Sequence, residues 1–84
     1  MKFRDFLPPE AAGASPRVVI NGRGEVLVAG HTGLYSYDTG RIRARTEWGI
    51  LTVEGQQLVI SYFGAQDMSI RGRVDQVRLE GEDP

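Results

Sequence analysis

The chain contains no cysteine and a single histidine, His31. Without thiols, disulfide bridges and thiolate metal sites are excluded, and one imidazole cannot form a histidine cluster. No apolar run approaches the roughly 20 residues that span a bilayer. The first ten residues, MKFRDFLPPE, lack the long apolar stretch of a secretory signal. We therefore expect a cytoplasmic protein.

The composition is that of one small soluble domain. The chain has 84 residues, of which 40% are hydrophobic and 25% charged. Its formal net charge of -1 gives no overall attraction to nucleic acid or to anionic lipid, so a local patch would have to supply one. A chain of this length buries a modest core, and self-association would add to its stability.

Short runs rich in Val, Ile, Leu and Tyr recur from Pro16 onward, separated by glycine-containing turns. No segment has a helical period longer than two turns. The expected strands cover residues 17–20, 25–29, 34–37 and 41–48, two arms of a hairpin within residues 49–63, and a run beginning near residue 67. We therefore predict an all-β domain of seven to eight short strands without a long helix, built as a sandwich, a roll or partly closed barrel, or a short β-solenoid.

Residues 49–63 have the clearest hairpin pattern, because apolar and polar residues alternate on both sides of Gly55. The side chains expected to face inward from its two arms are Leu51, Val53, Leu58, Ile60 and Tyr62. In the next run Met68 and Ile70 are expected to face inward. Gly72 predicts a bend or a close backbone approach, and Asp75-Gln76 a bulge or turn, because the apolar spacing slips there.

The chain divides into an N-terminal arm at 1–15, a β-domain at 16–80 and an acidic tail at 81–84. Phe3 and Phe6 give the arm two apolar side chains that could insert into a partner or a membrane interface, although so short a segment binds membranes weakly by itself. The alternative for the arm is a frayed terminus.

A basic stripe is the sharpest local feature. Arg41, Arg43 and Arg45 share one face of a strand, where they could contact consecutive phosphates of a single-stranded nucleic acid. Domains that bind in this way also place aromatic rings on the same face, whereas Trp48 is expected on the opposite side. The alternative is a solvated face whose arginines pair with carboxylates across the sheet.

No residue pattern indicates a catalytic centre. His31 lies in a glycine-flanked segment and is expected to be a turn or packing residue, with a hydrolase or ligand site around it as the alternative. No pair of carboxylates has the spacing of a metal loop. The aromatic residues expected in the core or at an interface are Tyr35, Tyr37, Trp48, Tyr62 and Phe63. We predict a protein that is not an enzyme, with no catalytic, cofactor-binding or metal-binding residues.

The order of several segments resembles the YabP/YqfC family of sporulation proteins, and the YqfC branch more closely because of the proline-flanked entry. The segments are LPPE at 7–10, PRVVING at 16–22, HTGL at 31–34, GILTVEG at 49–55, LVI at 58–60 and SIRGRV at 69–74. The sequence departs from the family at Gly30, where members often have asparagine; both residues suit a turn.

The resemblance implies a small protein made during sporulation. The YqfC branch is associated with a membrane-anchored partner, YqfD, in the mother cell, and the YabP branch with spore coat or cortex formation. No activity, cofactor or small-molecule substrate is attached to the family. We therefore expect a homo-oligomeric structural protein of the spore envelope, acting as a scaffold or adaptor in the mother-cell cytoplasm or at the forespore membrane. Nucleic-acid binding through Arg41, Arg43 and Arg45 is the alternative.

Overall fold

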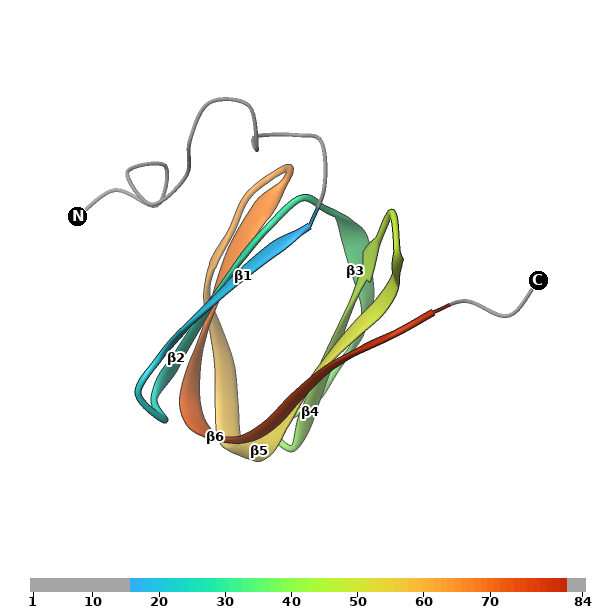
Figure 1. The fold of residues 1–84 in the computed structure, drawn as a ribbon. Helices are drawn as coiled ribbons and strands as arrows, with labels where there is room; N and C mark the ends of the chain where they lie inside the picture. Colours follow the sequence, from blue (N-terminus) through green and yellow to red (C-terminus); the bar gives the residue numbers. More distant parts are fainter. Residues whose placement is uncertain (1–15, 82–84) are drawn as a thin grey trace.

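The computed structural model describes residues 16–81, which form six antiparallel strands (Figure 1). The strands are β1 (Arg17–Asn21), β2 (Glu25–Ala29), β3 (His31–Tyr37), β4 (Arg41–Thr46), β5 (Gly49–Phe63) and β6 (Asp67–Glu80). They belong to one sheet in the order β1-β2-β6-β5-β4-β3. The all-β prediction is confirmed.

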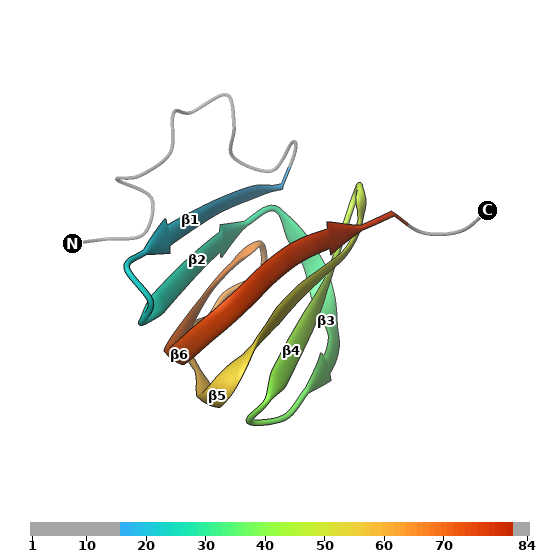
Figure 2. The same ribbon diagram turned by 60° about the horizontal axis from the view of Figure 1, so that its bottom comes forward.

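The sheet folds over on itself. β2 and β4 are separated in the sheet by β6 and β5, yet Val26 and Val28 of β2 share one buried cluster with Ile42 and Ala44 of β4. Figures 1 and 2 show how this happens: the long pair β5–β6 bends, with β1–β2 beside one part of β6 and β3–β4 beside one part of β5. Among the architectures left open by the sequence, the structure is a roll.

Two bulges on facing strands produce the bend. The register of β5 with β6 shifts between Glu54 and Gly55, which leaves Asp75 of β6 as an extra residue, as the slipped apolar spacing predicted. It shifts again after Gln56, where two residues of β5 lie opposite Gly72; one of them, Gln57, has φ 55°. Because such bulges bend and twist a strand without ending it, β5 continues through Gly55. The predicted hairpin within 49–63 is therefore wrong, and six strands replace the seven to eight expected.

Gly55 and Gly72 are required by close contact between the two backbones. A Cβ atom added to Gly55 would overlap the carbonyl oxygen of Arg73, and one added to Gly72 would lie 2.6 Å from the carbonyl oxygen of Gln57. Gly72 also has φ 136°, which side chains rarely allow. The close approach predicted at Gly72 is confirmed.

Both short hairpins dock on this bend in the same way. In the β3–β4 turn, the carbonyls of Thr39 and Gly40 accept hydrogen bonds from the Leu58 amide at 2.9 Å and the Gly55 amide at 3.1 Å. In the β1–β2 turn, the carbonyls of Arg23 and Gly24 accept from the Val74 amide at 2.8 Å and the Gly72 amide at 3.3 Å. The fold therefore has an approximate internal two-fold relation between β1–β2–β6 and β3–β4–β5.

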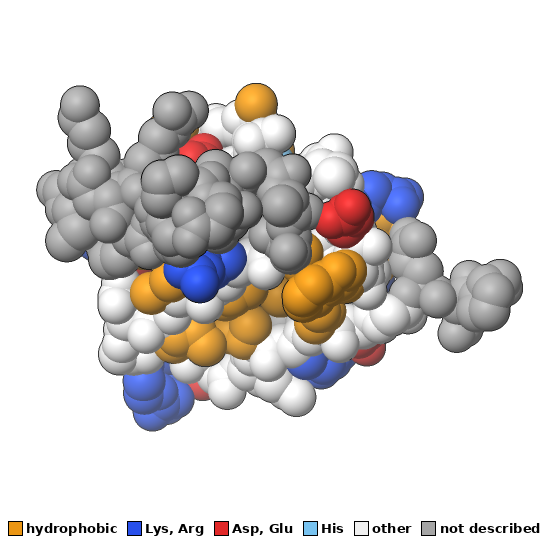
Figure 3. Space-filling model, turned by 45° about the horizontal axis from the view of Figure 1, so that its top comes forward, with side chains coloured by type: hydrophobic (Ala, Val, Ile, Leu, Met, Phe, Trp, Pro, Cys, Tyr) orange, Lys and Arg blue, Asp and Glu red, His pale blue; other side chains and the backbone are white. Residues whose placement is uncertain are grey.

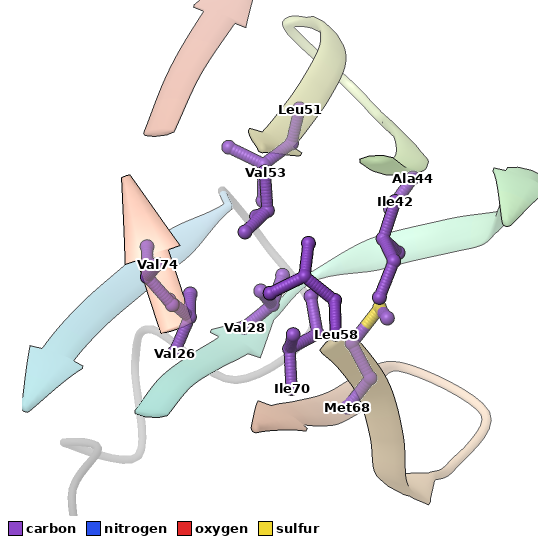
Figure 4. Close-up of a cluster of buried hydrophobic side chains, with 10 residues drawn as sticks. All are labelled: Val26, Val28, Ile42, Ala44, Leu51, Val53, Leu58, Met68, Ile70 and Val74. Carbon is purple, nitrogen blue, oxygen red and sulfur yellow. The ribbon is translucent and has the colours of Figure 1, made fainter. Parts of the chain in front are cut away.

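The core lies inside the fold, where side chains from four strands point toward one another (Figure 4). Its members are Val26, Val28, Ile42, Ala44, Leu51, Val53, Leu58, Met68, Ile70 and Val74. The inward assignments of Leu51, Val53, Leu58, Met68 and Ile70 are confirmed, and Ile60 packs against the cluster. Tyr62 is instead 51% exposed and pairs with Ser69, because a register shift between Ile60 and Tyr62 reverses the expected alternation.

Candidate functional site

The basic stripe lies on the outer face of β4. Ile42 and Ala44 are buried in the core, whereas Arg41, Arg43 and Arg45 alternate with them and point outward. The predicted placement of the three arginines on one face is therefore confirmed. Trp48 lies beyond the end of β4, in the turn to β5, and is 59% exposed.

Tyr35 supplies the aromatic ring that the sequence alone did not place on this face. The guanidinium carbon of Arg45 lies 4.8 Å from the centre of the Tyr35 ring, and that of Arg43 lies 5.8 Å from it, both within the range of cation–π attraction. Tyr35 reaches the arginines because the register of β3 with β4 shifts between Leu34 and Ser36, leaving Tyr35 as a bulged residue. A strand pattern read one segment at a time gives no signal for such a contact.

Carboxylates across the sheet neutralise another part of the same face. Glu54 accepts hydrogen bonds from Arg41 Nε and from Arg78 Nη1, each at 3.1 Å, and Arg78 Nε donates to Glu80 at 3.2 Å. The predicted pairing of the stripe with carboxylates is therefore present at Arg41. Arg43 differs, since its Nε is buried without a hydrogen-bond partner among the described residues.

His31 packs where the start of β3 meets the β5–β6 turn. It is the first residue of β3, not a turn residue as predicted, and is 2% exposed. Its Nε2 donates to the carbonyl oxygens of Gly64 at 3.0 Å and Asp67 at 3.2 Å, and its ring stacks on Phe63 with centroids 4.9 Å apart. These contacts fasten the start of β3 to the β5–β6 turn, so the packing role expected of His31 is what the geometry shows.

Within the described sheet, four strand segments are paired on one side and have a free edge on the other. These segments are β1, β3, the second half of β5 and the second half of β6. The core is open at these edges. In the cross-strand row Leu34–Ala44–Leu51–Leu79, the two middle residues are each 3% exposed, whereas Leu34 is 40% and Leu79 44% exposed. The inward face of this layer therefore ends in apolar side chains that contact water.

The same pattern occurs at the other free edges. The exposed residues that end the remaining inward rows are Ile20 of β1, Tyr37 of β3 and Phe63 of β5. Figure 3 shows hydrophobic side chains gathered on one face, with charged side chains around them. The five aromatic residues expected in the core or at an interface are each about half exposed, so none of them belongs to the core. They are Tyr35, Tyr37, Trp48, Tyr62 and Phe63.

The remaining sequence predictions concern the N-terminal arm, metal binding and membrane crossing. Phe3 and Phe6 lie outside the described residues. Within residues 16–81 no three carboxylate or histidine side chains are grouped so that they could hold a metal ion. The same range contains no helix with the length and hydropathy that crossing a bilayer requires.

Comparisons with known proteins agree with the sequence resemblance. The YabP family model matches residues 13–84, a range that takes in all six strands. An uncharacterized protein, YqfC, of Bacillus subtilis (strain 168) is similar, with 25% identity over 72 residues that cover 86% of this chain and 77% of YqfC. The resemblance to the YabP/YqfC family is confirmed, and the chain belongs to the YabP family.

Proposed function

We propose that the protein is a non-enzymatic scaffold or adaptor of spore morphogenesis, which assembles with copies of itself and docks on a membrane-anchored partner. The family is associated with sporulation. The observation that carries the proposal is the set of free strand edges whose inward-facing apolar residues are exposed, with Leu34, Leu79 and Ile20 as the clearest cases. Such an edge offers unpaired backbone groups together with apolar side chains, which an added strand would cover.

Self-assembly is tested by light scattering coupled to size-exclusion chromatography, over protein concentrations from micromolar to millimolar. We expect a mass above that of one chain, increasing with concentration. A monomer mass over the whole range would remove self-assembly from the proposal, and docking would then be its remaining part.

Docking is proposed to use the N-terminal arm. Phe3 and Phe6 would bury apolar area against a membrane-anchored protein of the YqfD type, which the family resemblance implies. A pull-down with the detergent-solubilised partner should lose most of its signal for the Phe3→Ser/Phe6→Ser variant. The matched control is Lys2→Ser/Arg4→Ser, which changes the same arm without removing its apolar side chains. Equal capture of both variants would contradict docking through the two phenylalanines.

A second candidate function, binding of single-stranded nucleic acid, has one observation in its favour. Tyr35 lies against Arg43 and Arg45, and aromatic rings beside cations are what sequence-tolerant binders use to stack bases and to track the backbone. Binding to a labelled oligonucleotide would be expected at low salt and would weaken steeply as salt rises.

The variants Arg41→Gln/Arg43→Gln/Arg45→Gln and Tyr35→Leu separate the two functions. Each should abolish or strongly weaken oligonucleotide binding while leaving the mass of the assembly unchanged. A triple variant that binds as tightly as the wild-type chain would contradict this second function.

A further inference from the structure

The four free edges differ in how well they are protected against pairing with another strand. Natural sheets block their edges with bulges, charges or covering segments. β1 pairs with β2 in one continuous register from Arg17 to Asn21, without a bulge. The charge on β1 is Arg17, at its first residue, and Pro16 precedes the strand, so its three central residues are Val18, Val19 and Ile20.

Each of the other edges carries such a device. β3 has two register shifts along its length. The free part of β5 has a shift between Ile60 and Tyr62, and Phe63 at its end stacks against the His31 ring. The free part of β6 alternates apolar residues with Arg78 and Glu80, which are paired with each other. Among the described edges, β1 is therefore the most suitable for strand addition.

The residues of β1 also complement one another when the strand is placed antiparallel to a copy of itself. With Val19 opposite Val19 of a second copy, Val18 faces Ile20 and Arg17 faces Asn21. Because directly opposite residues of an antiparallel pair point to the same side, the Val18–Ile20 pairs lie on the inward face of both sheets. No like charges meet in this register.

We propose that two copies of the chain pair through β1, antiparallel and centred on Val19, to form a two-fold symmetric dimer with a sheet continuous across both copies. The proposal rests on the self-assembly part of the proposed function and names its first contact. Ile20, which is 53% exposed in one chain although it ends an inward row, is covered by Val18 of the second copy. An interface of this symmetry brings residue 19 of each copy against residue 19 of the other.

The absence of cysteine in the full chain makes a direct test possible. Directly opposite residues have Cβ atoms about 4.5–5.5 Å apart, which a small shift brings to disulfide distance. Val19→Cys should therefore form a disulfide-linked dimer rapidly under mild oxidation with diamide, seen on a non-reducing gel. Val59→Cys is the matched control, because Val59 also lies on a free edge and is 47% exposed. Equal cross-linking of the two variants would overturn the proposal.

Charge substitution gives a second, non-covalent measurement. Val19→Lys or Val19→Glu alone places two like charges opposite each other, so the dimer dissociation constant should rise about tenfold or more. Mixing the two variants pairs opposite charges, so mixed dimers should form again. Val59→Lys should leave the mass unchanged, and circular dichroism reports whether each variant is folded.

The outcomes separate this proposal from the proposed function. A wild-type chain that assembles, with Val19→Lys assembling equally well, would overturn pairing through β1 and leave self-assembly intact. A wild-type chain that stays monomeric, as it would if its own arm occupied the β1 edge, would overturn both the β1 interface and the self-assembly part of the proposed function, and would leave docking to be tested separately. Mixed dimers together with rapid cross-linking at residue 19 would support the β1 interface.

Discussion

The contribution of a single side chain to the free energy of unfolding depends on how completely the roll buries it. Leu51 and Leu79 are cross-strand partners on the same inward row, yet Leu51 is 3% and Leu79 44% exposed. Leu51→Ala should lower the free energy of unfolding by about 2–5 kcal/mol, because it leaves a cavity where neighbouring side chains cannot close in. Leu79→Ala should lower it by less than about 1 kcal/mol.

Urea unfolding followed by circular dichroism measures both values. If Leu51→Ala unfolds the chain completely, Leu51→Val is the milder variant to compare with Leu79→Val. Equal losses for the two positions would contradict the assignment of Leu79 to an open edge of the core.

His31 should contribute to stability and not to chemistry. His31→Ala removes the stacking on Phe63 and the donor that the Gly64 carbonyl uses, so the free energy of unfolding should fall by about 2–4 kcal/mol. The neighbouring exposed residue provides the control, Thr32→Ala, for which we expect a change within about 0.5 kcal/mol. The midpoints of thermal unfolding of the two variants measure this difference in stability. Similar midpoints would mean that the imidazole does not stabilise the contact between β3 and the β5–β6 turn.

Among the elements, the bend of β5 and β6 depends most on particular residues. Gly55→Ala and Gly72→Ala each place a methyl group against a backbone carbonyl, and each should cost about 1–3 kcal/mol of stability. Gly24→Ala is the control, because its nearest atom, the Gly72 carbonyl oxygen, would lie at an ordinary 3.9 Å. Urea midpoints that are equal for Gly55→Ala and Gly24→Ala would show that the two backbones are farther apart than described.

The sequence predicts the strands well and their connections less well. Alternation of apolar and polar residues located β1, β2 and β4 and assigned the inward residues around Leu51 and Met68. The prediction failed at Gly55. A glycine that is needed because a carbonyl of a neighbouring strand lies close cannot be distinguished in the sequence from a glycine that is needed in a turn. The arginine face was predicted and its partner Tyr35 was not, since that contact depends on a bulge in another strand.

At the scale of the whole molecule, stability should be greatest where the two hairpins dock on the central pair. The Leu58 and Val74 amides, which donate to turn carbonyls at 2.9 and 2.8 Å, should exchange with deuterium far more slowly than amides directed to solvent from β1 in a dilute sample. At high concentration, protection should extend to β1 if a second copy covers it. Hydrogen exchange at two concentrations measures both effects, and early exchange at Leu58 and Val74 would contradict rigid docking.

The pairing of β2 with β6 also decides when the chain can fold. The N-terminal hairpin pairs with a strand that begins some 40 residues later, at Asp67, so the half β1–β2–β6 is interrupted in the sequence by the contiguous half β3–β4–β5. Contacts of such long range form slowly, because the intervening loop must close before they stabilise anything. During synthesis, the β1–β2 hairpin therefore lacks the strand on which it docks until β6 has emerged, so its addition to the sheet follows the translation of nearly the whole domain.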